Sequence, residues 1–173
     1  VNALGDGGIV TTDDPRIDER IRLLRNHGLS DRNTWVEAGY NMRLDSIQAI
    51  VGYHTLRQVE EVTEKRIANA RRYDEGFRDY NKIIIPPRNP RVRHVYHLYQ
   101  VEIRDATAEI RNTILAQLNE SGVEAKAHYP TPLHLQPALA HLGYKVGDFP
   151  RAERFCDTHI TLPCHQLLSP DQI

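Results

Sequence analysis

The first forty residues combine a turn, a short β-branched run and an amphipathic helix. Residues 5–8 are rich in glycine and predict a tight turn, while residues 9–12 are β-branched and predict a strand. Asp14 is a candidate N-cap for a helix whose apolar positions keep helical spacing until Gly28. Residues 29–40 show no period and predict an irregular loop, which is long enough to be functional.

The clearest helix start in the chain lies at Asp45. This residue can act as an N-cap, and Gln48 can reach back to it as in a capping box. Apolar residues then keep roughly helical spacing in two amphipathic stretches that continue to about Tyr80. The pattern predicts a long helical pair that could bridge two domains.

After residue 80, strand patterns alternate with helical ones. Strands are predicted at residues 83–85, 96–103 and 123–127, and helices at residues 105–122, 135–142 and 150–159. This interleaving predicts an α/β or α+β layer arrangement. The chain lacks an initiator Met and opens inside a glycine-rich turn, while Ser169 and Pro170 are typical of a helix start at its very end, so we expect both ends to be truncated.

Composition argues against several classes of protein. Lys and Arg number 22 and Asp and Glu 23, so the formal net charge is -1 and no strong field would attract nucleic acid or anionic lipid. The apolar runs are too short to cross a bilayer. We therefore expect a soluble, cytoplasmic protein. Cys156 and Cys164 are the only cysteines, and we expect both to be small buried side chains in a reducing compartment.

Asn41 and Arg43 precede the predicted helix start at Asp45. Free backbone N–H groups and the helix dipole favour an anion there, so an amide and a guanidinium at these positions are candidate readers of phosphate or carboxylate. The alternative from spacing alone is that Asn41 forms a turn and Arg43 pairs with Asp45 on the surface.

His128 and Tyr129 follow a predicted strand and precede Pro130. A strand end in a proline-braced loop is a frequent place for binding groups, and both side chains can donate to an oxyanion. The alternative is a packed loop with a structural histidine. His134, in the same loop, ranks below His128. His94 and His97 would point to opposite faces of a strand, so we expect no metal site there.

Several blocks of this sequence occur together in a recognisable order. They include Gly5-Asp6-Gly7-Gly8, Gly39-Tyr40-Asn41-Met42-Arg43-Leu44-Asp45, His97-Leu98-Tyr99, His128-Tyr129-Pro130, Gly147-Asp148-Phe149-Pro150-Arg151-Ala152-Glu153 and Leu162-Pro163-Cys164-His165. The series resembles the DegT/DnrJ/EryC1/StrS family of nucleotide-sugar aminotransferases, which depend on pyridoxal 5'-phosphate. The resemblance covers nearly the whole chain.

The resemblance implies a fold-type I transferase that forms a homodimer with shared active sites. Residues 1–75 would be the end of the large cofactor-binding domain with the bridging helix, and residues 76–173 the small α+β C-terminal domain. The lysine that binds the cofactor covalently would lie just upstream of Val1, so we expect this chain alone to be inactive and assign no catalytic residue within it.

The same resemblance assigns roles to four residues. Asn41 would reach the partner subunit's site and hold the cofactor phosphate, while Arg43, His128 and Tyr129 would meet the nucleotide diphosphate of the substrate. Glutamate or glutamine would donate the amino group to a keto-sugar. Two alternatives stay open: a sugar dehydratase of the same family with histidine in place of the lysine, and a non-catalytic protein that binds nucleotide sugars.

Overall fold

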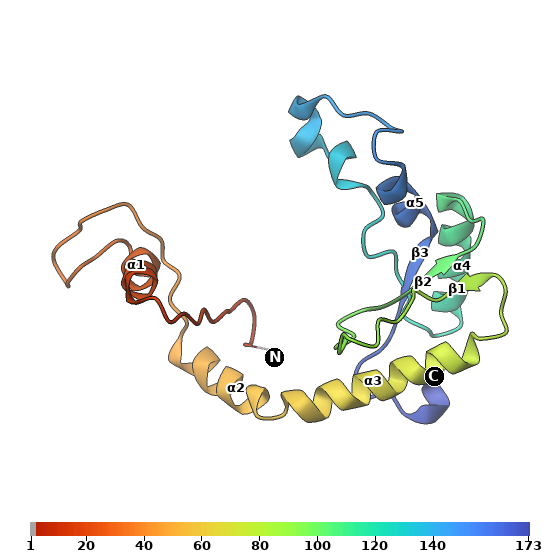
Figure 1. Cartoon of the computed structure of the whole chain (residues 1–173), viewed down its shortest axis with the longest axis horizontal. Coiled ribbons are helices and arrows are strands. Elements are labelled where there is room, and N and C mark those ends of the chain that lie inside the picture. The colour runs from red at the N-terminus through yellow and green to blue at the C-terminus, as the bar shows by residue number, and fades with distance from the viewer. Residues whose placement is uncertain (1–2) are drawn as a thin grey trace. The chain divides into compact units, whose positions relative to one another are not determined.

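The computed structural model describes residues 3–173, which divide into two compact units (Figure 1). The first unit ends at Glu60, and the second covers Glu61–Ile173. The expected domain assignment, residues 1–75 and 76–173, concerns the whole protein and stays a prediction. Within residues 3–173, no helix combines the length and the apolar composition that a membrane crossing requires.

The first unit contains two helices, and both begin with the caps that the sequence predicts. At the start of α1 (Pro15–Arg25), the Asp14 side chain accepts a hydrogen bond from a backbone N–H of the first turn at 2.9 Å. At the start of α2 (Ser46–Leu56), the Gln48 side chain accepts from the backbone N–H of Asp45 at 3.3 Å, which is one half of a capping box.

This unit has little core of its own. Neither α1 nor α2 contains a buried residue, and the large apolar side chains of α2, such as Ile47 and Tyr53, are mostly exposed. An apolar helix that is open on several sides is typical of an element that other protein surface covers in the assembled molecule.

The strand expected at residues 9–12 is not formed, so that prediction is wrong. The segment is irregular, and Ile9 and Val10 are largely exposed. A strand is stable only as part of a hydrogen-bonded ladder, and residues 3–60 supply no partner for this segment. β-branched composition indicates a preference for extended backbone, but it does not provide the neighbouring strand.

The long helical segment consists of two helices, in agreement with its two amphipathic stretches. The second, α3 (Val59–Gly76), is separated from the end of α2 by two residues. The break has a local cause, because the Thr55 hydroxyl donates to the Gly52 carbonyl at 3.1 Å and the Gln58 backbone N–H donates to the Thr55 carbonyl at 3.1 Å. Bonds that span three residues instead of four tighten the last turn and end the helix.

The second unit is built on a three-stranded antiparallel sheet. Its order is β1 (Ile83–Ile84), β2 (Tyr99–Ile103) and β3 (His159–Leu162), with Val101 opposite Ile160. Every second residue of β2 is buried. The central strand therefore carries its apolar face into the core of this unit.

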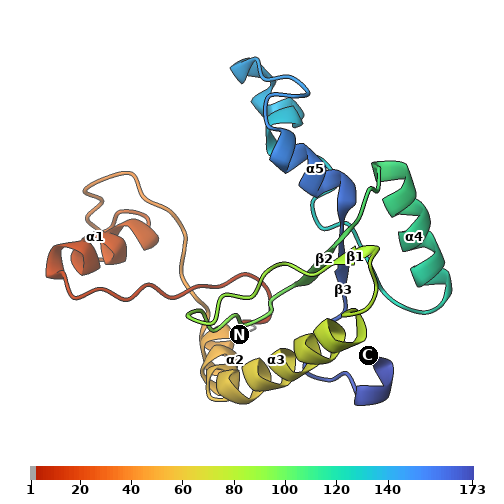
Figure 2. The same ribbon diagram turned by 45° about the vertical axis from the view of Figure 1, so that its right-hand side comes forward.

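The core of the second unit forms where α3 packs against the sheet (Figure 2). Ala70 and Tyr73 of α3 belong to the same buried cluster as Tyr99 and Val101 of β2. The rings of Tyr73 and Tyr99 are stacked with centroids 4.8 Å apart. The predicted amphipathic stretch of α3 is thus the face that covers the sheet.

Further helices complete the second unit. Thr107 caps α4 (Ala108–Glu120), and α5 (Pro150–Thr158) leads directly into β3. The helix predicted at residues 135–142 is replaced by the short 3-10 helices η1 (Leu133–Leu135) and η2 (Pro137–Leu142). A third, η3 (Pro170–Gln172), begins at the expected cap, Ser169.

Two strand predictions in this unit need correction. Residues 123–127 form only a single bridge, because the backbone N–H of Val123 donates to Leu118 at the end of α4 and the Asn119 side chain donates to the Ala125 carbonyl at 2.8 Å. Groups used by a helix end are not free for a ladder. Strand β2 starts at Tyr99 rather than three residues earlier, since the left-handed Tyr96 (φ 48°) interrupts extended backbone.

Both cysteines are buried free thiols, as the sequence indicates. Burial raises the pKa of the Cys156 thiol and of the Cys164 thiol, which keeps both protonated and poorly nucleophilic.

Candidate active site

In the first unit, the segment that carries Asn41 and Arg43 is fixed against the end of α1. The backbone N–H of Tyr40 donates to the Leu24 carbonyl at 2.7 Å, and the N–H of Met42 donates to the Arg25 carbonyl at 2.9 Å. These bonds use carbonyl groups that the end of a helix leaves without partners. The loop thus returns to α1 and then leads straight into α2.

Two glycines make this return possible. Gly28 is left-handed (φ 75°), and a Cβ atom there would lie 1.8 Å from the Glu37 carbonyl oxygen. A Cβ atom on Gly39 would lie 2.3 Å from the backbone nitrogen of Gly28. Two backbone segments therefore cross at a distance that no side chain allows.

The side chains of Asn41 and Arg43 contact each other and are otherwise exposed. The Arg43 Nε donates to the Asn41 Oδ1 at 3.1 Å. Arg43 does not pair with Asp45 within the described chain, so that alternative is not realised. Because the Asn41 oxygen is occupied, its Nδ2 amide donors and the outer guanidinium nitrogens of Arg43 stay available for an anion.

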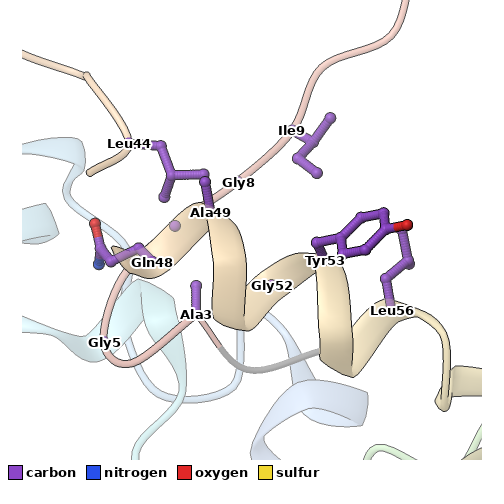
Figure 3. A pocket seen from close by; sticks show the side chains of 11 residues that line it. Ala3, Gly5, Gly8, Ile9, Leu44, Gln48, Ala49, Gly52, Tyr53 and Leu56 are labelled. Carbon is purple, nitrogen blue, oxygen red and sulfur yellow. The ribbon is translucent and has the colours of Figure 1, made fainter. Parts of the chain in front are cut away.

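The Gly-Asp-Gly-Gly turn belongs to the same unit and lies along α2 (Figure 3). The Gln48 side chain, besides its bond to the cap, donates from Nε2 to the Asp6 carbonyl at 3.1 Å. A pocket of about 700 Å³ opens between the turn and α2, lined by residues that include Gly8, Ile9 and Tyr53. The capping-box pattern identifies Gln48, but its contact with the turn spans 42 positions of the chain and was not predicted.

In the second unit, His128 and Tyr129 lie just after the bridge between Lys126 and Thr161. Their rings meet edge to face, with centroids 4.8 Å apart. Tyr129 is 59% exposed, whereas the Nδ1 atom of His128 is shielded from solvent and has no hydrogen-bond partner in the described residues. A shielded polar atom without a partner is unfavourable, and a bound molecule could supply one.

His134 has a different environment from His128. It is buried, and its Nε2 lies 3.1 Å from the Glu153 Oε1. The Glu153 carboxylate also accepts from the backbone N–H groups of Gly147 and Phe149. Glu153 was not singled out from the sequence, and its only signal was its place in the block at residues 147–153.

Asn41 and Arg43 are thus neighbours in the first unit, and His128 and Tyr129 are neighbours in the second. His94 and His97 precede β2 and are not on a strand, so the opposite-face argument does not apply to them. Within residues 3–173, no group of three or more His, Cys, Asp or Glu side chains has a metal-binding arrangement.

Comparison with known proteins identifies relatives that match nearly the whole of this chain. EryC1, the erythromycin biosynthesis sensory transduction protein of Saccharopolyspora erythraea, is 38% identical over 98% of this chain and 45% of its own length. A dTDP-3-amino-3,4,6-trideoxy-alpha-D-glucose transaminase of Streptomyces venezuelae is 35% identical over 94% of this chain and 42% of its own length. The chain thus spans less than half the length of these relatives.

A solved structure shows the same fold. The PLP-form of Spr1654 from Streptococcus pneumoniae matches with a TM-score of 0.85 and 29% identity, over 93% of this chain and 41% of that one. The likeness confirms the expected α/β, fold-type I class. The model of the DegT/DnrJ/EryC1/StrS aminotransferase family matches residues 1–173, and the chain belongs to that family.

Proposed function

We propose that the whole protein transfers an amino group from glutamate or glutamine to a nucleotide-linked keto-sugar, with pyridoxal 5'-phosphate as cofactor. The observation that carries this proposal is the Asn41–Arg43 contact ahead of α2, in a chain of the aminotransferase family. The contact orients the two side chains so that their remaining N–H donors are open to anionic oxygens.

The residues present fit the phosphate of the cofactor. Asn41 offers two amide N–H donors whose direction is set by the bond from Arg43 Nε, so it would hold that phosphate in the partner subunit's site. When bound, pyridoxal 5'-phosphate supplies an electron sink for the carbon that gains or loses the amino group. Asn41 contributes binding and orientation only.

Arg43, His128 and Tyr129 would bind the nucleotide diphosphate. A guanidinium offers a planar fork of donors that matches pairs of phosphate oxygens. His128 has a shielded nitrogen that lacks a hydrogen-bond partner among residues 3–173, and Tyr129 presents an exposed hydroxyl beside it. Neutral donors add contacts to the diphosphate without burying further charge.

None of the four lysines of this chain is assigned the covalent bond to the cofactor. Lys65 pairs with Glu61 on the surface of α3 at 2.7 Å, and the backbone of Lys126 forms the bridge to Thr161. Lys82 and Lys145 lie in the same unit, outside the block that resembles the cofactor-binding turn. By the family pattern, the position of that lysine lies upstream of Val1.

A homodimer with shared sites is part of the proposal. The apolar side chains of α2 are mostly exposed in one chain, which is expected of a helix that other protein surface covers. A cytoplasmic location also stays a prediction.

The test is amino transfer by the purified whole protein. It is incubated with its cofactor, a nucleotide-linked keto-sugar and either glutamate or glutamine. We expect the corresponding oxo acid to accumulate only when the keto-sugar is present, in equal amount to the amino-sugar. Sugar conversion without loss of the amino donor would contradict the proposal, as would binding of the sugar without any conversion.

A further inference from the structure

The loop that carries His128 and Tyr129 is fixed at both ends. On its N-terminal side, Lys126 and Thr161 exchange two backbone hydrogen bonds of 3.1 and 2.8 Å, which join the loop to β3. On its C-terminal side, the chain enters η1, where His134 is buried. Residues 127–133 form the span between these two anchors.

The second anchor is a single carboxylate, that of Glu153 in the first turn of α5. The Gly147 N–H donates to both of its oxygens at 2.9 Å, the Phe149 N–H donates to Oε1 at 3.2 Å, and His134 Nε2 lies 3.1 Å from Oε1. Glu153 therefore connects the start of α5, the loop before it and the loop that carries His128. The bond from Gly147 is the main cause that lowers the pKa of Glu153, so the acceptor is ionised at neutral pH.

Ring packing reinforces this anchor. The His134 ring lies 4.8 Å from the ring of Phe149, which in turn meets Tyr144 edge to face at 5.0 Å. The side chains of His134 and Glu153 are only 7% and 16% exposed. Pro130 and Pro132 lie between Tyr129 and His134 and fix two φ angles of the short connection. These fixed angles reduce the freedom with which the connection could absorb a displacement of His134.

We propose that the Glu153–His134 pair positions the loop of residues 127–133, so that His128 and Tyr129 keep the arrangement needed to bind a nucleotide diphosphate. Glu153 and His134 are positioning residues, since they act through the loop and not on the ligand. The inference rests on the proposed function for the ligand, but the conformation of the loop can be tested without any ligand.

The test compares variants of the whole protein. Glu153→Ala removes the acceptor, Glu153→Gln keeps one oxygen acceptor, and His134→Phe keeps a ring beside Phe149 without the nitrogen. Two readouts are taken: hydrogen exchange of the backbone amides in residues 127–133, and the dissociation constants for thymidine, uridine and guanosine diphosphate. A matched control is Glu102→Ala, because the Glu102 side chain is 18% exposed and binds Arg154 of α5 at 2.5 Å, while no hydrogen bond or ion pair within residues 3–173 joins it to residues 127–133.

Glu153→Ala and His134→Phe should speed exchange in residues 127–133 and raise the dissociation constant of the tightest diphosphate by roughly tenfold to a hundredfold, the effect of a small misplacement of binding groups. Glu153→Gln should restore most of the affinity. Glu102→Ala should lower the melting temperature but change that affinity less than about twofold, since it removes only a partly exposed ion pair.

Two outcomes separate this inference from the proposed function. Unchanged exchange in residues 127–133 of Glu153→Ala, or equal affinity losses in Glu153→Ala and Glu102→Ala, would overturn the positioning role. His128→Ala could bind every diphosphate as tightly as wild type while Glu153→Ala still speeds hydrogen exchange in residues 127–133. That result would support the positioning role and show that the assigned ligand contact of His128 is wrong.

Discussion

Asn41 is informative because the structure shows which of its side-chain atoms already has a partner in this chain. Its Oδ1 accepts from Arg43 Nε, so the amide presents Nδ2 as a donor. A donor in that orientation is suited to phosphate and unsuited to a cation. The orientation of the Asn41 amide thus follows from a contact with a side chain two positions away, which the sequence shows as a near neighbour but not as a bond.

We expect Asn41→Ala to weaken retention of pyridoxal 5'-phosphate. Loss of a hydrogen bond to a charged group corresponds to about 1.5–3 kcal/mol, or roughly a 10- to 100-fold rise in the dissociation constant. Asn41→Asp should be worse, because it places a carboxylate beside the phosphate. Cofactor absorbance after equilibrium dialysis of the whole protein measures both variants. Retention as tight as in wild type would show that Asn41 does not hold the cofactor.

His159 gives a pH-dependent contribution to stability. Burial lowers its pKa below the ordinary value of 6.5, and its ring stacks on Phe155 at 4.0 Å. The folded state therefore favours the neutral ring, and the unfolded chain binds a proton more readily. This contribution is present above pH 6.5 and is lost as the pH falls through the folded pKa.

The prediction is that the free energy of unfolding of the wild-type protein decreases more steeply between pH 7 and 5 than that of His159→Gln. Both proteins carry the same other histidines and carboxylates, so the difference between their curves isolates His159. Urea denaturation at several pH values measures it. Parallel curves would mean that His159 titrates alike in the folded and unfolded states.

At the level of elements, the crossing of Gly28 and Gly39 is what brings Asn41 back to the end of α1. We expect Gly39→Ala to destabilise the protein by about 1–3 kcal/mol, the usual range for overpacking, because the new Cβ would lie 2.3 Å from backbone. The control is Gly76→Ala at the end of α3, where nothing lies within 4 Å and a change below about 1 kcal/mol is expected. Denaturant unfolding curves measure the free energy of unfolding of both variants. Equal losses would argue against a requirement for the close backbone approach at Gly39.

The elements that could be predicted from the sequence are those with local causes. The caps at Asp14 and Asp45 are formed by residues within one turn of each helix, and both helices start where expected. Strands depend on distant partners. The sequence does not predict β3, because it follows α5 without a turn and pairs with β2 far earlier in the chain. It predicts a strand at residues 9–12, which have no strand partner among residues 3–173.

The same distinction between local causes and distant contacts applies to the residues of the candidate site. Asn41, Arg43, His128 and Tyr129 can be selected from their positions beside predicted element ends and from the family resemblance. The role of Glu153 could not be selected in this way, since its carboxylate joins segments that are separate in sequence. Its contacts emerge only from tertiary structure.

For the whole molecule, we propose that Arg43 and His128 bind the same ligand, although they belong to separate units of the chain. Family membership covers all 173 residues, and both residues lie in blocks that carry the family resemblance. Their shared role in a homodimer is a proposal, and ligand binding by variants of each residue tests it.

The most direct measurement is titration calorimetry of the whole protein, its Arg43→Ala variant and its His128→Ala variant with a nucleoside diphosphate, alongside the cofactor content of each. We predict that each variant binds the diphosphate about 10- to 100-fold more weakly, as expected for a lost charge-assisted hydrogen bond, while cofactor content stays at the wild-type level. Wild-type affinity in either variant, or an equal loss of cofactor and diphosphate, would contradict the account.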